Sequence, residues 1–270
     1  MDFVCPKCRG ELVTVGNSKK CANGHSFDKA REGYYNLLLG TGRGIHGDNP
    51  EMVRARREFL NSGHYEKLRI RLTELVLSVV SRGEGVLDCG SGEGYYTDGI
   101  ERALYERDEK SRVFGFDISK DAVRYAAKRN KRLRLSVASA YEIPLGDGTA
   151  DCALNVFSPL ALDEMRRIIR HGGYFIMAYP AEEHLFALKE LLYEHPYKNK
   201  PEDTRIFGFS LVSHERLSYD MHLKSCSEVQ ALFMMTPYAY RTPKEARERL
   251  FKLDNFTCGA DFYIDLYKRD

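Results

Sequence analysis

Apolar residues recur along this chain in two spacings, one typical of helices and one of buried strands. Between residues 65 and 81 they return every three or four positions, as at Leu68, Leu72 and Leu75, which predicts a helix with one apolar face. A second helix is predicted for residues 51–61. From residue 85 onward, short apolar runs alternate with helical segments. The predicted strands are 85–88, 113–117, 133–137, 152–157 and 174–179, and the predicted helices between them are 95–105, 122–129 and 162–169.

This alternation of strand and helix is typical of a parallel sheet with helices on both faces. The sequence therefore predicts an α/β fold. Beyond residue 180 the pattern is less regular, with a helix expected at 184–193, a polar loop at 198–204 and a strand at 215–223. Residues 256–267 are rich in aromatic and apolar side chains and predict a final strand, antiparallel at the far side of the sheet.

The N-terminal part of the chain has a different organisation. Residues 1–38 lack long apolar runs and hold three of the seven cysteines, so they need a metal to fold. Four glycines between Gly40 and Gly47, followed by Pro50, indicate a flexible linker or a loop that orders on binding. We expect a small metal-binding module at 1–38, a linker and helix at 39–64, and the α/β domain at 65–270.

Composition and charge narrow the class of protein. The chain has 270 residues and 43% hydrophobic content, enough for a sizeable core, which excludes intrinsic disorder. It has no apolar run of membrane-spanning length and no signal peptide at its start, so we expect a soluble, cytoplasmic protein with no membrane partner. Its 41 basic and 39 acidic residues are unevenly placed, because residues 1–82 hold 14 basic against 9 acidic side chains, a net +5. This excess indicates that the N-terminal part meets an anion such as nucleic acid.

Four potential metal ligands lie within the first 25 residues. Two residues separate Cys5 from Cys8, twelve more precede Cys21, and another three precede His25. This spacing is typical of zinc, and four protein ligands leave no position for water, so the site is expected to be structural. The alternatives are that the cysteines are ordinary loop residues, or that His25 is only a surface histidine. The remaining cysteines are expected in the core: Cys89, Cys152, Cys226 and Cys258.

A glycine-rich loop follows the first strand of the α/β domain. Asp88 ends that strand, and Gly90, Gly92 and Gly94 follow at alternate positions, where they let the backbone approach a ligand closely. The order D-x-G-x-G-x-G resembles the cofactor loop of Rossmann-like class I methyltransferases that use S-adenosylmethionine. Asp117 ends the second strand, where a carboxylate can accept both ribose hydroxyls of an adenosine. The alternative is that Asp88 only forms a turn and Asp117 only caps a helix.

Residues after the third and fourth strands complete the candidate site. Ser139 follows the third strand, at the position where such enzymes enclose the adenine. After the fourth strand, where the acceptor base is usually met, the candidates are Asn155, Phe157, Ser158 and Pro159. The ring of Phe157 is expected either to stack on the base or to be a core residue at a strand end. The sequence identifies no general base.

Several further motifs make the chain resemble one known family, the RlmA-type ribosomal RNA (guanine-N1) methyltransferases. The resemblance spans nearly the whole chain. It is carried by Cys5-Pro6-x-Cys8 with Cys21 and His25, Phe27-Asp28, Glu32-Gly33-Tyr34, Arg56-Arg57-x-Phe59-Leu60, Gly63-His64-Tyr65, Gly92-Glu93-Gly94-Tyr95-Tyr96-Thr97, His184-Leu185 and Met235-Thr236-Pro237.

The resemblance implies that S-adenosylmethionine donates a methyl group to N1 of a guanine in a hairpin of 23S ribosomal RNA. It also implies a zinc module that helps to recognise the RNA, a homodimer, and cofactor contacts from Tyr65, Tyr96, Thr97 and His184. The module at 1–38 would then be a zinc-binding RNA-recognition module, and 65–270 the methyltransferase domain. One departure is Ser91, which replaces a cysteine often found inside the loop.

Two alternatives to an RNA methyltransferase are open at the level of sequence. One is a methyltransferase that acts on a small molecule or a protein, and the other is a protein that binds S-adenosylmethionine without catalysis. Candidate contacts to an RNA backbone, each of which could equally be a solvated charge, are Arg54, Arg56, Arg57, Lys7, Arg9, Lys19, Lys20 and the basic residues of 128–134.

Overall fold

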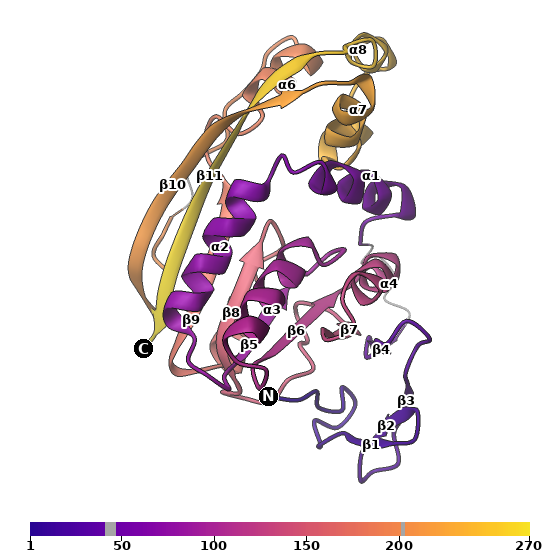
Figure 1. Ribbon diagram of the computed structural model, residues 1–270, viewed down its shortest axis with the longest axis vertical. Coiled ribbons are helices and arrows are strands. Elements are labelled where there is room, and N and C mark those ends of the chain that lie inside the picture. The colour runs from indigo at the N-terminus through magenta and orange to yellow at the C-terminus, as the bar shows by residue number, and fades with distance from the viewer. Residues whose placement is uncertain (41–46, 201–202) are drawn as a thin grey trace.

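The structure is a computed structural model that describes residues 1–40, 47–200 and 203–270. In this part of the chain one large sheet has the strand order β10-β11-β9-β8-β5-β6-β7-β4, and a small sheet has the order β1-β2-β3 (Figure 1). The strands of the large sheet are β4 (Tyr35–Asn36), β5 (Gly85–Cys89), β6 (Arg112–Asp117), β7 (Arg134–Val137), β8 (Ala150–Val156), β9 (Ile169–Pro180), β10 (Phe209–Leu223) and β11 (Phe256–Arg269). Those of the small sheet are β1 (Val13–Val15), β2 (Ser18–Lys20) and β3 (Ser26–Asp28).

The helices alternate with these strands as the sequence predicts. They are α1 (Pro50–Asn61), α2 (Glu66–Val79), α3 (Tyr95–Arg107), α4 (Lys120–Arg129), α5 (Leu162–Ile168), α6 (Phe186–Leu192), α7 (Cys226–Met234), the 3-10 helix η1 (Pro237–Tyr240) and α8 (Lys244–Leu250). The sequence pattern did not indicate α7, η1 or α8. No helix among the described residues is long and apolar enough to cross a bilayer.

The strand pairing confirms the predicted α/β class. Strands β5 to β9 pair in parallel, and β11 joins β9 in the antiparallel direction, as expected for residues 256–267. Strand β10 then pairs with β11 along almost its whole length. Both strands are longer than the sequence pattern predicted: β10 begins at Phe209 instead of residue 215, and β11 ends at Arg269 instead of residue 267.

Two hydrophobic clusters lie on opposite faces of the sheet. On one face, side chains of α2, α3 and α4 such as Leu72, Ile100 and Val123 pack on the strands. On the other face, Met165 and Ile168 of α5 share a cluster with Phe3 and with strand residues. Helices therefore lie on both faces, as predicted, and the N-terminal module helps α5 to cover the second one.

The N-terminal module packs directly on the sheet. The rings of Phe3 and Phe114 meet edge to face with their centroids 5.2 Å apart, and both side chains are buried. Strand β4 pairs in parallel with β7, with Tyr35 opposite Ser136. The module is thus held to the large sheet by side-chain packing and by backbone pairing. The boundary at residue 38 stays a prediction.

Helix α1 lies across the carboxyl ends of the parallel strands (Figure 1). The side chain of Asn49 caps it by accepting hydrogen bonds from the backbone N–H groups of Glu51 and Met52. The residues just before the cap contact the loop after β6, where Ser119 Oγ donates to the carbonyl oxygen of Asp48 (2.9 Å). Residues 41–46 of the predicted linker, and residues 201–202 of the predicted polar loop, lie outside the described part of the chain.

Candidate active site

The four candidate metal ligands come together in the N-terminal module. Their ligand atoms all lie within 4.8 Å of one another. Cys5 Sγ and Cys21 Sγ are each 3.4 Å from His25 Nδ1, and Cys8 Sγ is 3.7 Å from Cys21 Sγ. A tetrahedral zinc ion with ordinary bond lengths needs ligand separations of about 3.5 to 3.8 Å. The cluster therefore fits zinc, with all four positions filled by protein.

The surroundings of the thiols suit a metal that binds thiolates. The pKa of the Cys8 thiol is lowered to about 6, first by a backbone hydrogen bond from Gly10 and then by His25. Burial instead raises the pKa of Cys5, so this thiol depends more on a metal to lose its proton. Such a site would release zinc as the pH falls and the thiolates are protonated.

The glycine loop places two carboxylates at the carboxyl ends of the neighbouring strands β5 and β6. Thr97 Oγ1, in the first turn of α3, donates to Asp88 Oδ2 (2.5 Å). The backbone N–H groups of Gly92 and Ser119 donate to the two oxygens of Asp117, at 3.0 and 2.8 Å. Each oxygen of Asp117 keeps a lone pair for a further donor such as a ribose hydroxyl.

Asp88 is buried, and Asp117 is half-buried. Burial raises the pKa of Asp88 to about 6, the hydroxyl of Thr97 opposes this shift, and the charge of Asp117 adds to it. Burial also raises the pKa of Asp117, against the two backbone hydrogen bonds that it accepts. A cationic ligand beside Asp88 would favour its charged form. This arrangement fits an ammonium group and would repel a pyrophosphate.

The glycine loop and the loop after β8 touch each other. Gly90 has φ +75°, and a Cβ added to it would lie 2.5 Å from the Cβ of Ser158. Ser158 Oγ donates to the carbonyl oxygen of Cys89 (2.8 Å). The cofactor loop therefore lies directly against the candidate acceptor loop, at a spacing that only glycine permits at position 90.

An aromatic cluster lies next to the acceptor loop. It joins Tyr65 at the start of α2, Phe157 after β8, His184 after β9 and Phe262 of β11, with ring centroids 4.7 to 6.4 Å apart. The Phe157 backbone has φ +57°, in the left-handed region that costs a residue with a Cβ about 1 kcal/mol or more. Its ring is 41% exposed, although the rest of the cluster is buried. A strained, exposed aromatic residue at this place fits a role in ligand contact.

His184 is neutral in this cluster. Burial lowers its pKa to about 3, against the charge of Asp261. The backbone N–H of Asp261 donates to Nδ1 (3.3 Å), so the ring proton is assigned to Nε2, which lies 3.3 Å from Tyr65 Oη. His184 then donates to the tyrosine oxygen. The hydroxyl hydrogen of Tyr65 is left to be donated to a ligand.

The other predicted site residues differ in whether their polar side-chain atoms already have hydrogen-bond partners within the protein. Among the described residues, Tyr96 Oη is buried and has no hydrogen-bond partner, which is the condition expected of a group that a ligand completes. Ser139 Oγ accepts from the backbone N–H of Tyr141 (3.2 Å), in a turn after β7. Asn155 is buried and donates to the carbonyl oxygen of Pro159 (3.2 Å), so its side chain shapes the acceptor loop.

Sequence reasoning missed two features of the site. Phe262 joins the aromatic cluster only because β11 pairs with β9, and the aromatic and apolar run that predicted this strand did not show which of its residues would face the site. Glu93 of the glycine loop is buried and forms an ion pair with Arg129 of α4. The presence of an acidic residue inside a loop with three glycines could have indicated that Glu93 has a basic partner nearby.

Many candidate RNA-contacting residues have partners within the protein. Arg56 pairs with Asp48, and Arg57 lies over the ring of Tyr125. Lys19 is buried and donates to Asp2 and to the Leu12 carbonyl. Arg132 and Arg129 form ion pairs with acidic residues, and Arg9 donates to two carbonyl oxygens. The exposed candidates outside these pairings include Lys7, Lys20, Arg54 and Lys128.

Comparison with known proteins identifies the class first. Residues 81–228 match the family described as "Methyltransferase domain". A methyltransferase solved in complex with the Trm112 activator of Haloferax volcanii, itself described as putative, has the same fold, with a TM-score of 0.52 over 83% of this chain and 99% of that one, at 18% identity. The protein is a methyltransferase that uses S-adenosylmethionine.

The particular family follows from the rest of the chain. Residues 3–39 match the zinc ribbon described as "RlmA, N-terminal". A 23S rRNA (guanine(748)-N(1))-methyltransferase of Streptomyces fradiae is 34% identical over 92% of this chain and 90% of its own length. A putative 23S rRNA (guanine-N(1)-)-methyltransferase of Bacillus subtilis, YxjB, is 28% identical over 98% and 94%. The chain belongs to the family of 23S rRNA (guanine-N1)-methyltransferases with an N-terminal zinc ribbon.

Proposed function

We propose that this protein transfers a methyl group from S-adenosylmethionine to N1 of one guanine in a hairpin of 23S ribosomal RNA. The proposal rests on one observation: a single chain joins an RlmA zinc ribbon to a cofactor-binding site. The S. fradiae relative supports it, because the match covers almost the full length of both proteins. A methyltransferase for a small substrate needs no such ribbon.

The cofactor side of the site is assigned from the chemistry of each group. Asp88 would face the ammonium group and Asp117 the ribose hydroxyls, while Gly90 and Gly92 let the backbone approach. Tyr65, Tyr96, Thr97, Ser139 and His184 complete the proposed set of cofactor contacts. S-adenosylmethionine supplies an electrophilic methyl group, so the main tasks of the protein are in-line positioning and exclusion of water.

On the acceptor side, we assign the stacking surface to Phe157. Guanine N1 carries a proton at neutral pH, which must be lost as the bond from N1 to the methyl carbon forms and the sulfur–methyl bond breaks to leave S-adenosylhomocysteine. The base must also leave its stack to reach the methyl group. The exposed ring of Phe157 lies beside the loop that touches Gly90, so a guanine stacked on it would lie close to the cofactor. The carbonyl groups near Ser158 and Pro159 would hold the edge of the base.

The direct test is to incubate the protein with labelled S-adenosylmethionine and 23S ribosomal RNA and to map the modified nucleotide. We expect one labelled guanine, blocked at N1, in a hairpin loop. Label in protein or in a small molecule, but not in RNA, would favour the alternative substrates. Tight cofactor binding with no transfer to any of these would indicate a binding protein without catalysis.

Two further statements belong to this proposal. We expect a homodimer in the cytoplasm, where ribosomal RNA is modified. Light scattering combined with size-exclusion chromatography measures the mass in solution. A mass near 31.0 kDa would contradict the dimer and leave the chemistry untouched.

A further inference from the structure

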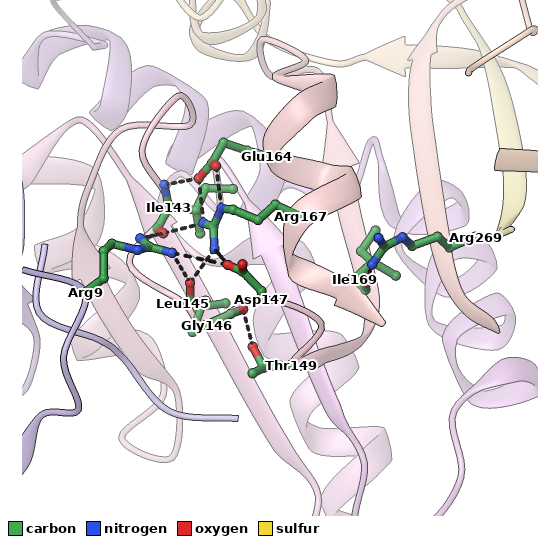
Figure 2. Close-up of polar contacts among 10 residues, drawn as sticks. All are labelled: Arg9, Ile143, Leu145, Gly146, Asp147, Thr149, Glu164, Arg167, Ile169 and Arg269. Carbon is green, nitrogen blue, oxygen red and sulfur yellow. Dashed lines mark hydrogen bonds and ion pairs between the residues drawn. The ribbon is translucent and has the colours of Figure 1, made fainter. Parts of the chain in front are cut away.

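The segment between β7 and β8 lies between the zinc ribbon and α5, and it carries Ser139. Its first part is a turn, in which the backbone N–H of Glu142 donates to the carbonyl oxygen of Ser139 (3.2 Å). Its second part, residues 143–147, is buried at Ile143, Pro144 and Leu145 and is contacted from both sides (Figure 2). The position of the Ser139 turn therefore depends on what holds residues 143–147.

On one side the contact comes from the zinc ribbon. Arg9 donates to the carbonyl oxygens of Ile143 (3.0 Å) and Leu145 (2.7 Å), and it lies 3.8 Å from Asp147. The backbone N–H of Val4 donates to the carbonyl oxygen of Pro144 (2.9 Å). Arg9 directly follows the zinc ligand Cys8 and has φ +61°, so the geometry of the metal knuckle sets the direction of its side chain.

On the other side the contact comes from α5. Arg167 donates to the same two carbonyl oxygens, at 2.9 and 2.8 Å, and to Asp147 (2.7 Å). Glu164 accepts from the backbone N–H of Ile143 (2.6 Å). Figure 2 shows the two guanidinium groups meeting at the carbonyls of Ile143 and Leu145, one from each flank of the segment. The contacts from α5 do not involve the zinc site. Those of Arg9 come from the zinc ribbon.

We propose that Arg9 is a positioning residue that couples the zinc knuckle to the cofactor site through residues 143–147. The inference rests on the proposed function, because it takes Ser139 to lie at the adenine of S-adenosylmethionine. A ribbon without zinc cannot hold Arg9 in place, so the Ser139 turn loses one of its two supports. Zinc would then strengthen cofactor binding at a site to which it contributes no ligand.

The coupling is reciprocal. If bound zinc increases the affinity for S-adenosylmethionine, bound S-adenosylmethionine must increase the affinity for zinc by the same factor. A ribbon that serves only to contact RNA would show neither effect, since no RNA is needed for either measurement.

The experiment compares the full-length protein with the variant Arg9→Met, each with one zinc bound. Calorimetric titration with S-adenosylmethionine should show affinity at least about fivefold weaker for Arg9→Met, within the usual range for coupled sites. Lys19→Met is the matched control, because Lys19 also donates to two groups of its surroundings, Asp2 and the Leu12 carbonyl, but not to residues 143–147. Equal affinity in wild type and Arg9→Met would overturn the proposal.

Zinc affinity gives the second measurement, by competition with a coloured chelator. S-adenosylmethionine should tighten zinc binding in the wild type and in Lys19→Met, and it should have no effect in Arg9→Met. No effect in the wild type would overturn the coupling. If Arg9→Met fails to retain zinc, Arg9→Lys tests the same point, because lysine keeps the charge without the planar fork that bridges two carbonyls. A wild type that binds no S-adenosylmethionine would instead refute the proposed function.

Discussion

Asp88 is a buried carboxylate, and its negative charge destabilises the folded protein when no cofactor is bound. Its side chain is 2% exposed, and the one hydrogen bond described for it comes from Thr97. Burial raises its pKa from 3.8 to about 6, so the folded protein binds a proton there that the unfolded chain has already lost. Ionised Asp88 therefore lowers the stability of the cofactor-free protein above pH 6, by about 1 to 3 kcal/mol. A cationic ligand would offset this cost.

Asp88→Asn should have opposite effects on stability and on binding. At pH 7.5 the variant without cofactor should melt several degrees higher than the wild type, and the difference should vanish toward pH 4, where Asp88 is protonated. Its affinity for S-adenosylmethionine should fall at least about tenfold, because one charge-assisted interaction is worth about 1.5 to 3 kcal/mol. Thermal melts and calorimetry at both pH values measure this. Unchanged affinity would remove Asp88 from the cofactor site.

Phe157→Ala tests the proposed stacking surface. Stacking of a base on an aromatic ring contributes about 1 to 3 kcal/mol, so turnover should fall by about tenfold or more while cofactor affinity changes less than twofold. Phe157→Gly should turn over as slowly as Phe157→Ala but should be slightly more stable than that variant, because glycine tolerates φ +57°. Phe157→Tyr keeps the ring and should keep most of the rate. Turnover at the wild-type level in Phe157→Ala would contradict the stacking role and favour the alternative that Phe157 only packs at the end of its strand.

Among the elements, α1 with its preceding residues covers the cofactor side of the sheet. A Cβ added to Gly47 would lie 2.7 Å from Ile118 Cγ2 and 2.9 Å from the backbone nitrogen of Ser119. These distances are too short, and φ at Gly47 is not positive, so glycine is required here for close approach alone. The segment thereby reaches the loop that holds Asp117.

Gly47→Ala should push this segment away from the loop after β6. The expected result is a several-fold weaker affinity for S-adenosylmethionine and a loss of about 1 to 3 kcal/mol in stability, as for other overpacked sites. Gly259→Ala is the control, because the nearest atom to its added Cβ is 4.0 Å away. Calorimetry and thermal melts compare the two variants. An effect no larger than that of the control would show that the segment adapts freely.

The element pattern was predictable to different degrees along the chain. The parallel strands β5 to β9 were found because each contains a short apolar run bounded by turn residues, whereas the two-residue strand β4 is too short to leave such a pattern. Helix α7 was missed because it is apolar around most of its circumference, with no polar face to mark a helical period. Helix α8 has the opposite composition, with five charged residues among seven, and only Ala246 and Leu250 are buried.

At the scale of the whole molecule, charge is divided between the zinc ribbon with its linker and the catalytic domain. Many of the basic side chains near the ribbon turn out to have partners within the protein, as Arg9 and Lys19 do. An RNA contact surface on the ribbon would therefore depend on exposed residues such as Lys7 and Lys20. We therefore expect fewer contacts between the ribbon and RNA phosphates than the excess of basic residues in the N-terminal part suggests.

Salt dependence measures how many phosphates the protein neutralises. Affinity for a 23S hairpin RNA should fall steeply as salt rises, and Lys7→Gln with Lys20→Gln should reduce the slope of log affinity against log salt by about 0.7 to 0.9 for each phosphate that is no longer neutralised. Lys110→Gln serves as the control, since Lys110 is exposed in the loop that leads into the amino end of β6. A slope unchanged in the double variant would place the phosphate-binding residues elsewhere on the surface.

The sequence by itself determined the α/β class, the zinc-ligand spacing and the glycine loop with its two carboxylates. Each is a local pattern, because periodicity, turn residues and ligand spacing act over a few positions. Only the tertiary structure decided that Phe262 joins Tyr65 and His184, that Ser158 lies against Gly90, and that Arg9 holds the segment after Ser139. These contacts depend on strand order and on how the ribbon packs on the sheet. Both follow from burying apolar surface shared between distant parts of the chain, which no local pattern encodes.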